Sequence, residues 1–207
     1  MKSDDRTPSV RQLSHRVDFF RGKRDYLRAA DVLSAGPLET PPDSFQFFFK
    51  KIARHSGEWK KQNHRPGPDT APTPVATLTM SFAQRKEKWD FIIDEPSVTV
   101  VRLPDINESA LIANIRLTKE ELFCTLSGAF TLWDCTVAAA RVGFFRDRQW
   151  HLAYIMGNRN CFPHTLDGLP MTLRLCRQRK GFIEFDFELA GLAAGKLGVF
   201  PKTGTRD

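Results

Sequence analysis

The first third of the chain carries hydrophobic residues at helical spacing. Leu27, Ala30 and Leu33 lie three residues apart, and Gly36-Pro37 follows them. This spacing places the three side chains on one face, and a Gly-Pro pair cannot continue a helix. The pattern therefore predicts a short helix within residues 24–34.

A second periodic segment begins after two prolines and Asp43-Ser44, a pair that suits a helix cap. Phe45, Phe48, Phe49 and Ile52 then fall at positions i, i+3, i+4 and i+7. This is the spacing of one apolar stripe on a helix. The pattern predicts a second helix, with its phenylalanines packed on the rest of the protein or on a second copy of it.

The chain changes to a strand-like pattern after a proline-rich stretch at residues 62–74, which predicts a linker or a long loop. The clearest strand is 182–189, where apolar residues alternate with Glu184, Asp186 and Glu188. It should form a hairpin with 171–177 across a turn that ends at Gly181. Further strands are expected at these segments: 75–82, 89–93, 98–103, 110–117, 141–145 and 150–156.

The segment 118–142 is ambiguous between helix and strand. Thr118 with Glu121 matches a capping box, which favours a helix from Lys119 to about Ser127 or as far as Arg141. Thr131, Trp133, Thr136 and Val137 favour strand instead. We prefer the short helix, ending near Gly128.

Together these elements predict an α+β protein with a mainly antiparallel, curved sheet of about six to eight strands, either a sandwich or a half-barrel. The short helices lie mostly in the N-terminal third. Residues 1–74 form a basic N-terminal arm with two short helices and the linker, and residues 75–207 form a β-rich domain on which the helices dock. Residues 1–22 are polar and read as a weakly ordered arm.

The charge of the chain is concentrated before the linker. The formal net charge is +7 over 207 residues, and residues 1–66 hold 14 Lys/Arg against 8 Asp/Glu. A localised basic segment favours polyanionic partners. The candidate contact residues for a nucleic acid are Lys50, Lys51, Arg54, Trp59, Lys60, Lys61 and Arg65, with the lysines and arginines on phosphates and Trp59 stacked on an unpaired base.

The leading functional prediction is therefore a non-enzymatic binding module whose basic N-terminal third contacts an anionic partner. An alternative is a small hydrolase or transferase in the loop 157–168. There Cys161 would be the nucleophile, His164 its base and Asp167 the group that orients the histidine. A second alternative is a carrier with a phenylalanine-lined cavity for a small apolar ligand.

The remaining expectations concern location and assembly. The first 24 residues lack the apolar segment of a secretion signal, and no run of residues is long enough to span a membrane. The four cysteines are widely spaced and suit reduced thiols, so we expect a cytoplasmic protein. We expect no cofactor, no metal and no membrane partner. A homodimer through the stripe Phe45, Phe48 and Phe49 is a further hypothesis.

Overall fold

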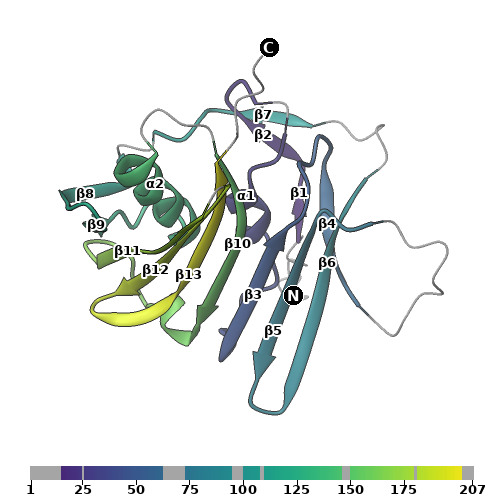
Figure 1. Ribbon diagram of the computed structural model, residues 1–207. Coiled ribbons are helices and arrows are strands. Elements are labelled where there is room, and N and C mark those ends of the chain that lie inside the picture. The colour runs from purple at the N-terminus through teal and green to yellow at the C-terminus, as the bar shows by residue number, and fades with distance from the viewer. Residues whose placement is uncertain are drawn as a thin grey trace, which may run out of the picture.

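The computed structural model describes residues 15–24, 26–62, 73–94, 100–107, 110–145, 150–179 and 181–201. The protein is an α+β molecule built from a largely antiparallel sheet and few helices (Figure 1). Arg65, residues 1–14 and nearly all of the proline-rich stretch lie outside the described residues.

The chain repeats one pattern, in which a helix follows one or two strands and precedes four more. The first repeat contains β1 (Arg16–Val17), β2 (Phe19–Arg21), α1 (Ala29–Ser34), β3 (Ser44–Phe49), β4 (Gly57–Lys61), β5 (Ala76–Phe82) and β6 (Arg85–Ile93). The strand β7 (Val101–Leu103) connects the repeats and pairs in parallel with β2.

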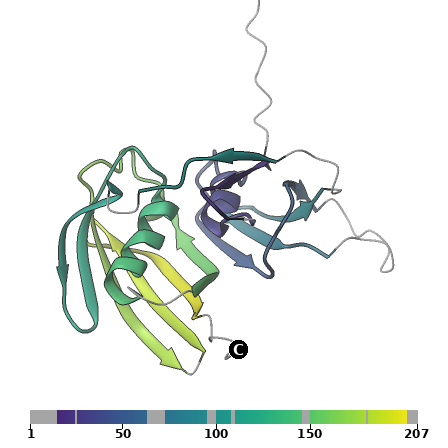
Figure 2. The ribbon, with the colours of Figure 1, turned by 90° about the horizontal axis from the view of Figure 1, so that it is seen from above.

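The second repeat contains β8 (Ile112–Leu117), β9 (Glu121–Leu126), α2 (Leu132–Phe144), β10 (Trp150–Asn158), β11 (Pro170–Arg179), β12 (Phe182–Leu189) and β13 (Leu192–Pro201). A short 3-10 turn, Arg159–Cys161, follows β10. Figure 2 shows the two repeats side by side, each with its own helix.

Eleven of the described strands form one sheet in the order β1-β4-β6-β5-β3-β10-β13-β12-β11-β9-β8. The repeats join in the middle of this sheet, where β3 pairs antiparallel with β10. The sheet is thus larger than the six to eight strands predicted. Strands on both sides of the proline-rich stretch pair with each other, β3 with β5 and β4 with β6, so β1, β3 and β4 before this stretch are part of the sheet.

The two helices lie against the same face of the sheet, which we call the inner face. Phe45 of β3 packs edge-on against Trp133 of α2, and Phe185 of β12 packs against Phe144 of α2. Phe185 alternates with exposed or half-buried acidic residues along β12, as its sequence predicts. The opposite, outer face of the central strands carries no helix among the described residues.

The predicted second helix is wrong, because residues 44–49 form strand β3. Phe45 and Phe47 are buried on the inner face, while Phe48 points to the outer face and contacts Tyr154. The stripe Phe45, Phe48 and Phe49 therefore does not exist as one surface. Aromatic side chains fit a half-buried pleated surface well, and this preference outweighs the helical spacing.

Three other expectations are also corrected. Thr118 does cap a turn, since its hydroxyl accepts from the Glu121 amide, but strand β9 follows in place of a helix. The helix α2 covers 132–144, so the strand expected at 141–145 is wrong. The longest described helix therefore lies outside the N-terminal third.

Candidate active site

A cluster of four charged side chains and one threonine links the two helices. It consists of Arg21, Arg28, Asp31, Thr131 and Asp134, and we call it the inter-helix cluster. The aspartates occupy equivalent places, because each is the third residue of its helix. Arg28 immediately precedes α1, and Thr131 immediately precedes α2.

Arg28 bridges the two helices. Its Nη2 donates to Asp134 Oδ1 at 3.0 Å, and its Nη1 lies 3.8 Å from Asp31 Oδ1. The side chains of Arg28, Asp31 and Asp134 are only 11%, 5% and 7% exposed. Removing such charges from water is costly unless they are paired, so one guanidinium serves both carboxylates.

The carboxylate of Asp134 is fully engaged. Besides Arg28, it accepts a hydrogen bond from the Thr131 hydroxyl at 2.8 Å. The Thr131 oxygen in turn accepts from the Asp134 amide, which caps α2, and from the hydroxyl of Ser34 at 3.2 Å. Ser34 is exposed, so this chain of hydrogen bonds links the buried cluster to the surface.

Only one of the two carboxylate oxygens of Asp31 accepts a hydrogen bond. Its Oδ1 accepts from Arg21 Nε at 2.9 Å, but its Oδ2 is buried without a hydrogen-bond partner in the described part of the chain. The same is true of Arg28 Nη1. Buried polar atoms without partners are rare in native proteins, and each requires an explanation. The inter-helix cluster thus contains one acceptor and one donor that make no hydrogen bond to the described residues.

Burial raises the pKa of Asp31, and this effect outweighs the attraction of Arg28 and Arg21. Nearby Asp134 adds to the increase. A carboxyl group with a raised pKa can exchange a proton closer to neutral pH than an ordinary aspartate can. The cluster therefore contains the elements of an acid–base site: a proton acceptor and a cationic donor.

The raised pKa predicts a pH-dependent contribution to stability. Between the ordinary value of 3.8 and the raised one, folded Asp31 keeps a proton that the unfolded chain releases. Asp31 thus stabilises the fold at low pH and loses this contribution as the pH rises through the raised pKa. The free energy of unfolding of wild type minus that of Asp31→Asn, from urea titrations at several pH values, should fall with increasing pH. A difference that rises with pH would show that the arginines dominate over burial.

The structure does not assemble the predicted cysteine site. Cys161 is buried, its thiol donates to the Ala194 carbonyl at 3.1 Å, and burial raises its pKa to about 12. Asp167 is exposed and accepts from the Gly128 amide, and His164 is exposed. No hydrogen bond joins these three side chains among the residues described. A thiol with so high a pKa is not a nucleophile at neutral pH.

The structure does not align the predicted nucleic-acid contact residues on one helix face. Trp59 is 4% exposed on the inner face of β4, and its Nε1 donates to the Val32 carbonyl of α1 at 2.8 Å. It cannot stack on a base. Lys60 pairs with Glu58 at 3.0 Å and Lys61 with Glu87 at 2.7 Å. Lys50, Lys51 and Arg54 are exposed but lie beyond the end of β3, with no helix to align them. The prediction of a non-enzymatic module for an anionic partner is therefore wrong.

The remaining expectations concern the phenylalanines, metal ligands, membrane spans and the cysteines. The phenylalanines expected to line a ligand cavity pack on one another and on tryptophans, as Phe45 does on Trp133 and Phe162. No group of three or more metal-ligating side chains occurs in the described ranges. No described helix has the length and apolar character needed to cross a membrane. All four cysteines are free.

Sequence reasoning missed the inter-helix cluster altogether. Arg28 and Asp134 lie more than one hundred positions apart, so no local motif connects them. A usable signal was the recurrence of an aspartate three residues after each capping position. It becomes visible only once the two helices are recognised as repeats.

No protein-family model and no curated protein matches the chain. Several solved structures are similar to it at low identity. A conserved protein of unknown function with hot dog fold from Alicyclobacillus acidocaldarius is 14% identical over 86% of this chain and 86% of that chain, with a TM-score of 0.41. The dehydratase domain of RzxB from Pseudomonas fluorescens is 8% identical over 94% and 92%, with a TM-score of 0.46. An acyl-CoA thioesterase II from Mycobacterium marinum is 10% identical over 85% and 87%, with a TM-score of 0.38.

Proposed function

We propose that the protein is an enzyme of general acid–base type that hydrolyses an acyl thioester at the inter-helix cluster. The observation that carries this proposal is a pair of buried polar atoms with unused hydrogen-bonding capacity. Asp31 Oδ2 is an acceptor and Arg28 Nη1 is a donor, and neither has a hydrogen-bond partner among the described residues. Arg28 Nη1 lies 3.8 Å from Asp31 Oδ1, which is ion-pair distance but too long for a hydrogen bond. Both atoms therefore keep their hydrogen-bonding capacity for substrate and water.

The roles follow from the chemistry of the two groups. Asp31 Oδ2 takes a proton from a water molecule, which attacks the thioester carbonyl carbon. Arg28 Nη1 donates to the oxyanion that forms, in a site of low dielectric where such a bond is strong. The tetrahedral intermediate then expels the thiolate, which receives the proton held by Asp31. Asp134 and Arg21 are positioning residues, because each holds one side of the pair.

Thioesters are the first substrates to test because two of the similar structures are named as a thioesterase and a dehydratase domain. The assay measures release of free thiol from acyl-CoA thioesters of short, medium and long chain.

We expect wild type to release thiol, and Asp31→Asn to lower kcat/KM by about 10²–10⁴-fold, the usual contribution of a general base. Activity should fall on the acid side, with its midpoint above the ordinary aspartate value of 3.8, because the base must be deprotonated. Arg28→Lys keeps the charge but removes the Nη1 donor, so it should lower kcat more than it raises KM.

The matched control is Asp105→Asn. Asp105 also accepts from an arginine, Arg24, but it is exposed and makes no ion pair with the inter-helix cluster in the described part of the chain. It should keep wild-type kinetics, and circular dichroism confirms that each variant is folded. Absence of thiol release from every thioester, or an active Asp31→Asn, would overturn the proposal.

A further inference from the structure

We infer that two copies of the chain stack through the outer faces of their sheets, about a two-fold axis parallel to the strands at the β3–β10 boundary. The inference rests on the distribution of aromatic and charged side chains over that face. It is independent of the catalytic proposal.

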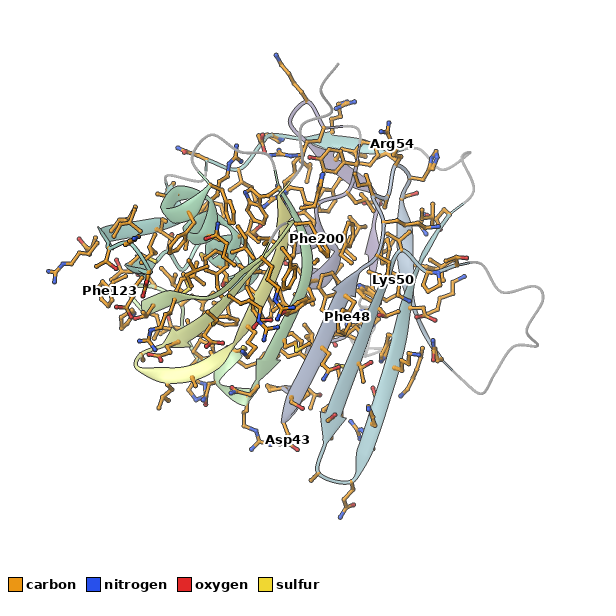
Figure 3. All side chains as sticks on the ribbon, viewed as in Figure 1. Asp43, Phe48, Lys50, Arg54, Phe123 and Phe200 are labelled. Atoms are coloured by element: carbon orange, nitrogen blue, oxygen red, sulfur yellow. The ribbon has the colours of Figure 1, made fainter. Side chains whose placement is uncertain are left out.

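An aromatic row crosses the middle of the outer face. The ring centroids of Phe48 and Tyr154 are 5.8 Å apart, those of Tyr154 and Phe182 6.1 Å, and those of Phe182 and Phe200 5.4 Å. Phe200 is 51% exposed, and Figure 3 shows Phe48 and Phe200 over the central strands. Aromatic side chains on an open sheet face are typical of a contact surface.

Gly198 makes room for this row. A Cβ at Gly198 would lie 2.2 Å from the Tyr154 ring, so the ring occupies the place that a side chain would take. Tyr154 lies across β13 and donates to Glu184 of β12. This arrangement places the Tyr154 ring over β13, between Phe48 of β3 and Phe182 of β12.

Unpaired charge differs on the two sides of the β3–β10 boundary. On β6 of the first repeat, Lys86 and Lys88 are exposed and have no ion-pair partner in the described part of the chain. On β12 of the second repeat, the outer positions are Glu184, Asp186 and Glu188, whose carboxylates pair with Lys196 and Arg174. Both strands are the third from the β3–β10 boundary, on opposite sides of it.

The strand registers place these charges at the same level of the sheet. Consecutive paired residues run across it from Lys88 to Asp186, through Thr79, Gln46, Met156 and Lys196. A two-fold axis parallel to the strands keeps this level and exchanges the two sides. It therefore brings Lys88 of one copy opposite Asp186 of the other.

An axis across the strands would instead place β6 on β6, so that the unpaired Lys86 and Lys88 of each copy would face the same strand of the other, which is unfavourable. Charge complementarity thus selects one of the two stacking modes. At the next level the selected axis brings Asp90 towards Glu184, but Gln62 and Tyr154 already donate to these carboxylates. The occupant of the outer face is therefore a second copy in the selected orientation.

The test is sedimentation velocity of the full chain over a concentration series. We expect a reversible dimer for wild type. Lys88→Glu and Asp186→Lys should each raise the dimer dissociation constant by about tenfold or more, because each places like charges opposite one another. The double variant Lys88→Glu/Asp186→Lys restores opposite charges and the wild-type net charge, so it should recover the affinity to within about threefold.

Lys51→Glu is the matched control, since it changes the net charge as Lys88→Glu does, at an exposed lysine off the outer face. It should leave the dimer unchanged. Thermal unfolding of each variant verifies that it is folded. A wild type that stays monomeric at every concentration, single variants that dimerise as wild type does, or a double variant that fails to recover would each overturn the inference.

Discussion

Replacing Arg28 with Met should destabilise the protein by about 3–5 kcal/mol, the usual cost of removing one partner from a buried ion pair. The substitution leaves both Asp31 and Asp134 without their shared cation, although each is less than a tenth exposed. Met preserves most of the apolar stem, so packing changes little. Urea denaturation, monitored by tryptophan fluorescence, measures the change in the free energy of unfolding.

The loss should be partly reversed by a second substitution. Asp31 keeps its bond from Arg21 in the Arg28→Met variant. Arg28→Met/Asp31→Asn removes one of the two carboxylates that lost Arg28 and should recover part of the stability, because the cost arises from buried negative charge without enough cations. Arg24→Met is the control: Arg24 binds the exposed Asp105, and we expect a loss of about 1 kcal/mol or less. Equal losses for Arg28→Met and Arg24→Met would contradict the assignment of a buried shared cation.

Trp59→Ala should destabilise the protein by about 3–5 kcal/mol, as large-to-small substitutions of buried aromatic residues do. The indole packs on Phe47 and Phe91, and it holds α1 through its bond to Val32. This helix has only six residues and depends on such tertiary contacts for its stability. The measurement is the midpoint and slope of denaturant unfolding.

Trp59→Phe separates packing from hydrogen bonding at this position. It keeps an aromatic ring but leaves the Val32 carbonyl without its donor, so we expect a loss of about 1–3 kcal/mol. The neighbouring exposed Lys60, changed to Ala, should alter stability by no more than about 0.5 kcal/mol. If Trp59→Ala cost as little as Lys60→Ala, the residue would not anchor α1.

The sequence predicted strands best where one face is apolar and the other charged. In β12 each buried residue alternates with an acidic one, so only a period of two fits. In β3 nearly every residue is phenylalanine, and the segment fits a helical period and a strand period equally well. The decision there lies in the pairing of β3 with β5 and β10, which no local pattern encodes.

Helix α2 was hidden for a related reason. The capping box at Thr118 is real as a hydrogen bond but terminates in a β-turn between β8 and β9. The helix begins later, where Thr131 caps the Asp134 amide, and it includes Thr136 and Val137 because burial overrides their strand preference. Local propensity therefore indicated a helix in this part of the chain, but it placed the start near Lys119 and not at Leu132.

The candidate site could not be predicted from local motifs, because its chemistry depends on burial. Asp31 and Arg28 belong to no sequence motif. Packing between the helices buries both side chains and leaves one polar atom of each without a hydrogen-bond partner. Cys161 shows the opposite case: next to turn residues it suggests a reactive thiol, but the same burial makes it inert. In both cases the reactivity of the side chain depends on its burial, which a sequence does not show.

The junction of β3 with β10 also has a consequence for how the chain acquires its structure. Phe48 and Tyr154 are paired there although more than one hundred residues separate them. Every other long pairing in the sheet joins strands of the same repeat. Closing so long a loop is entropically expensive and slow compared with forming a hairpin. The two repeats are therefore expected to collapse separately, and their late docking, which also buries Arg28 between the helices, sets the rate of folding.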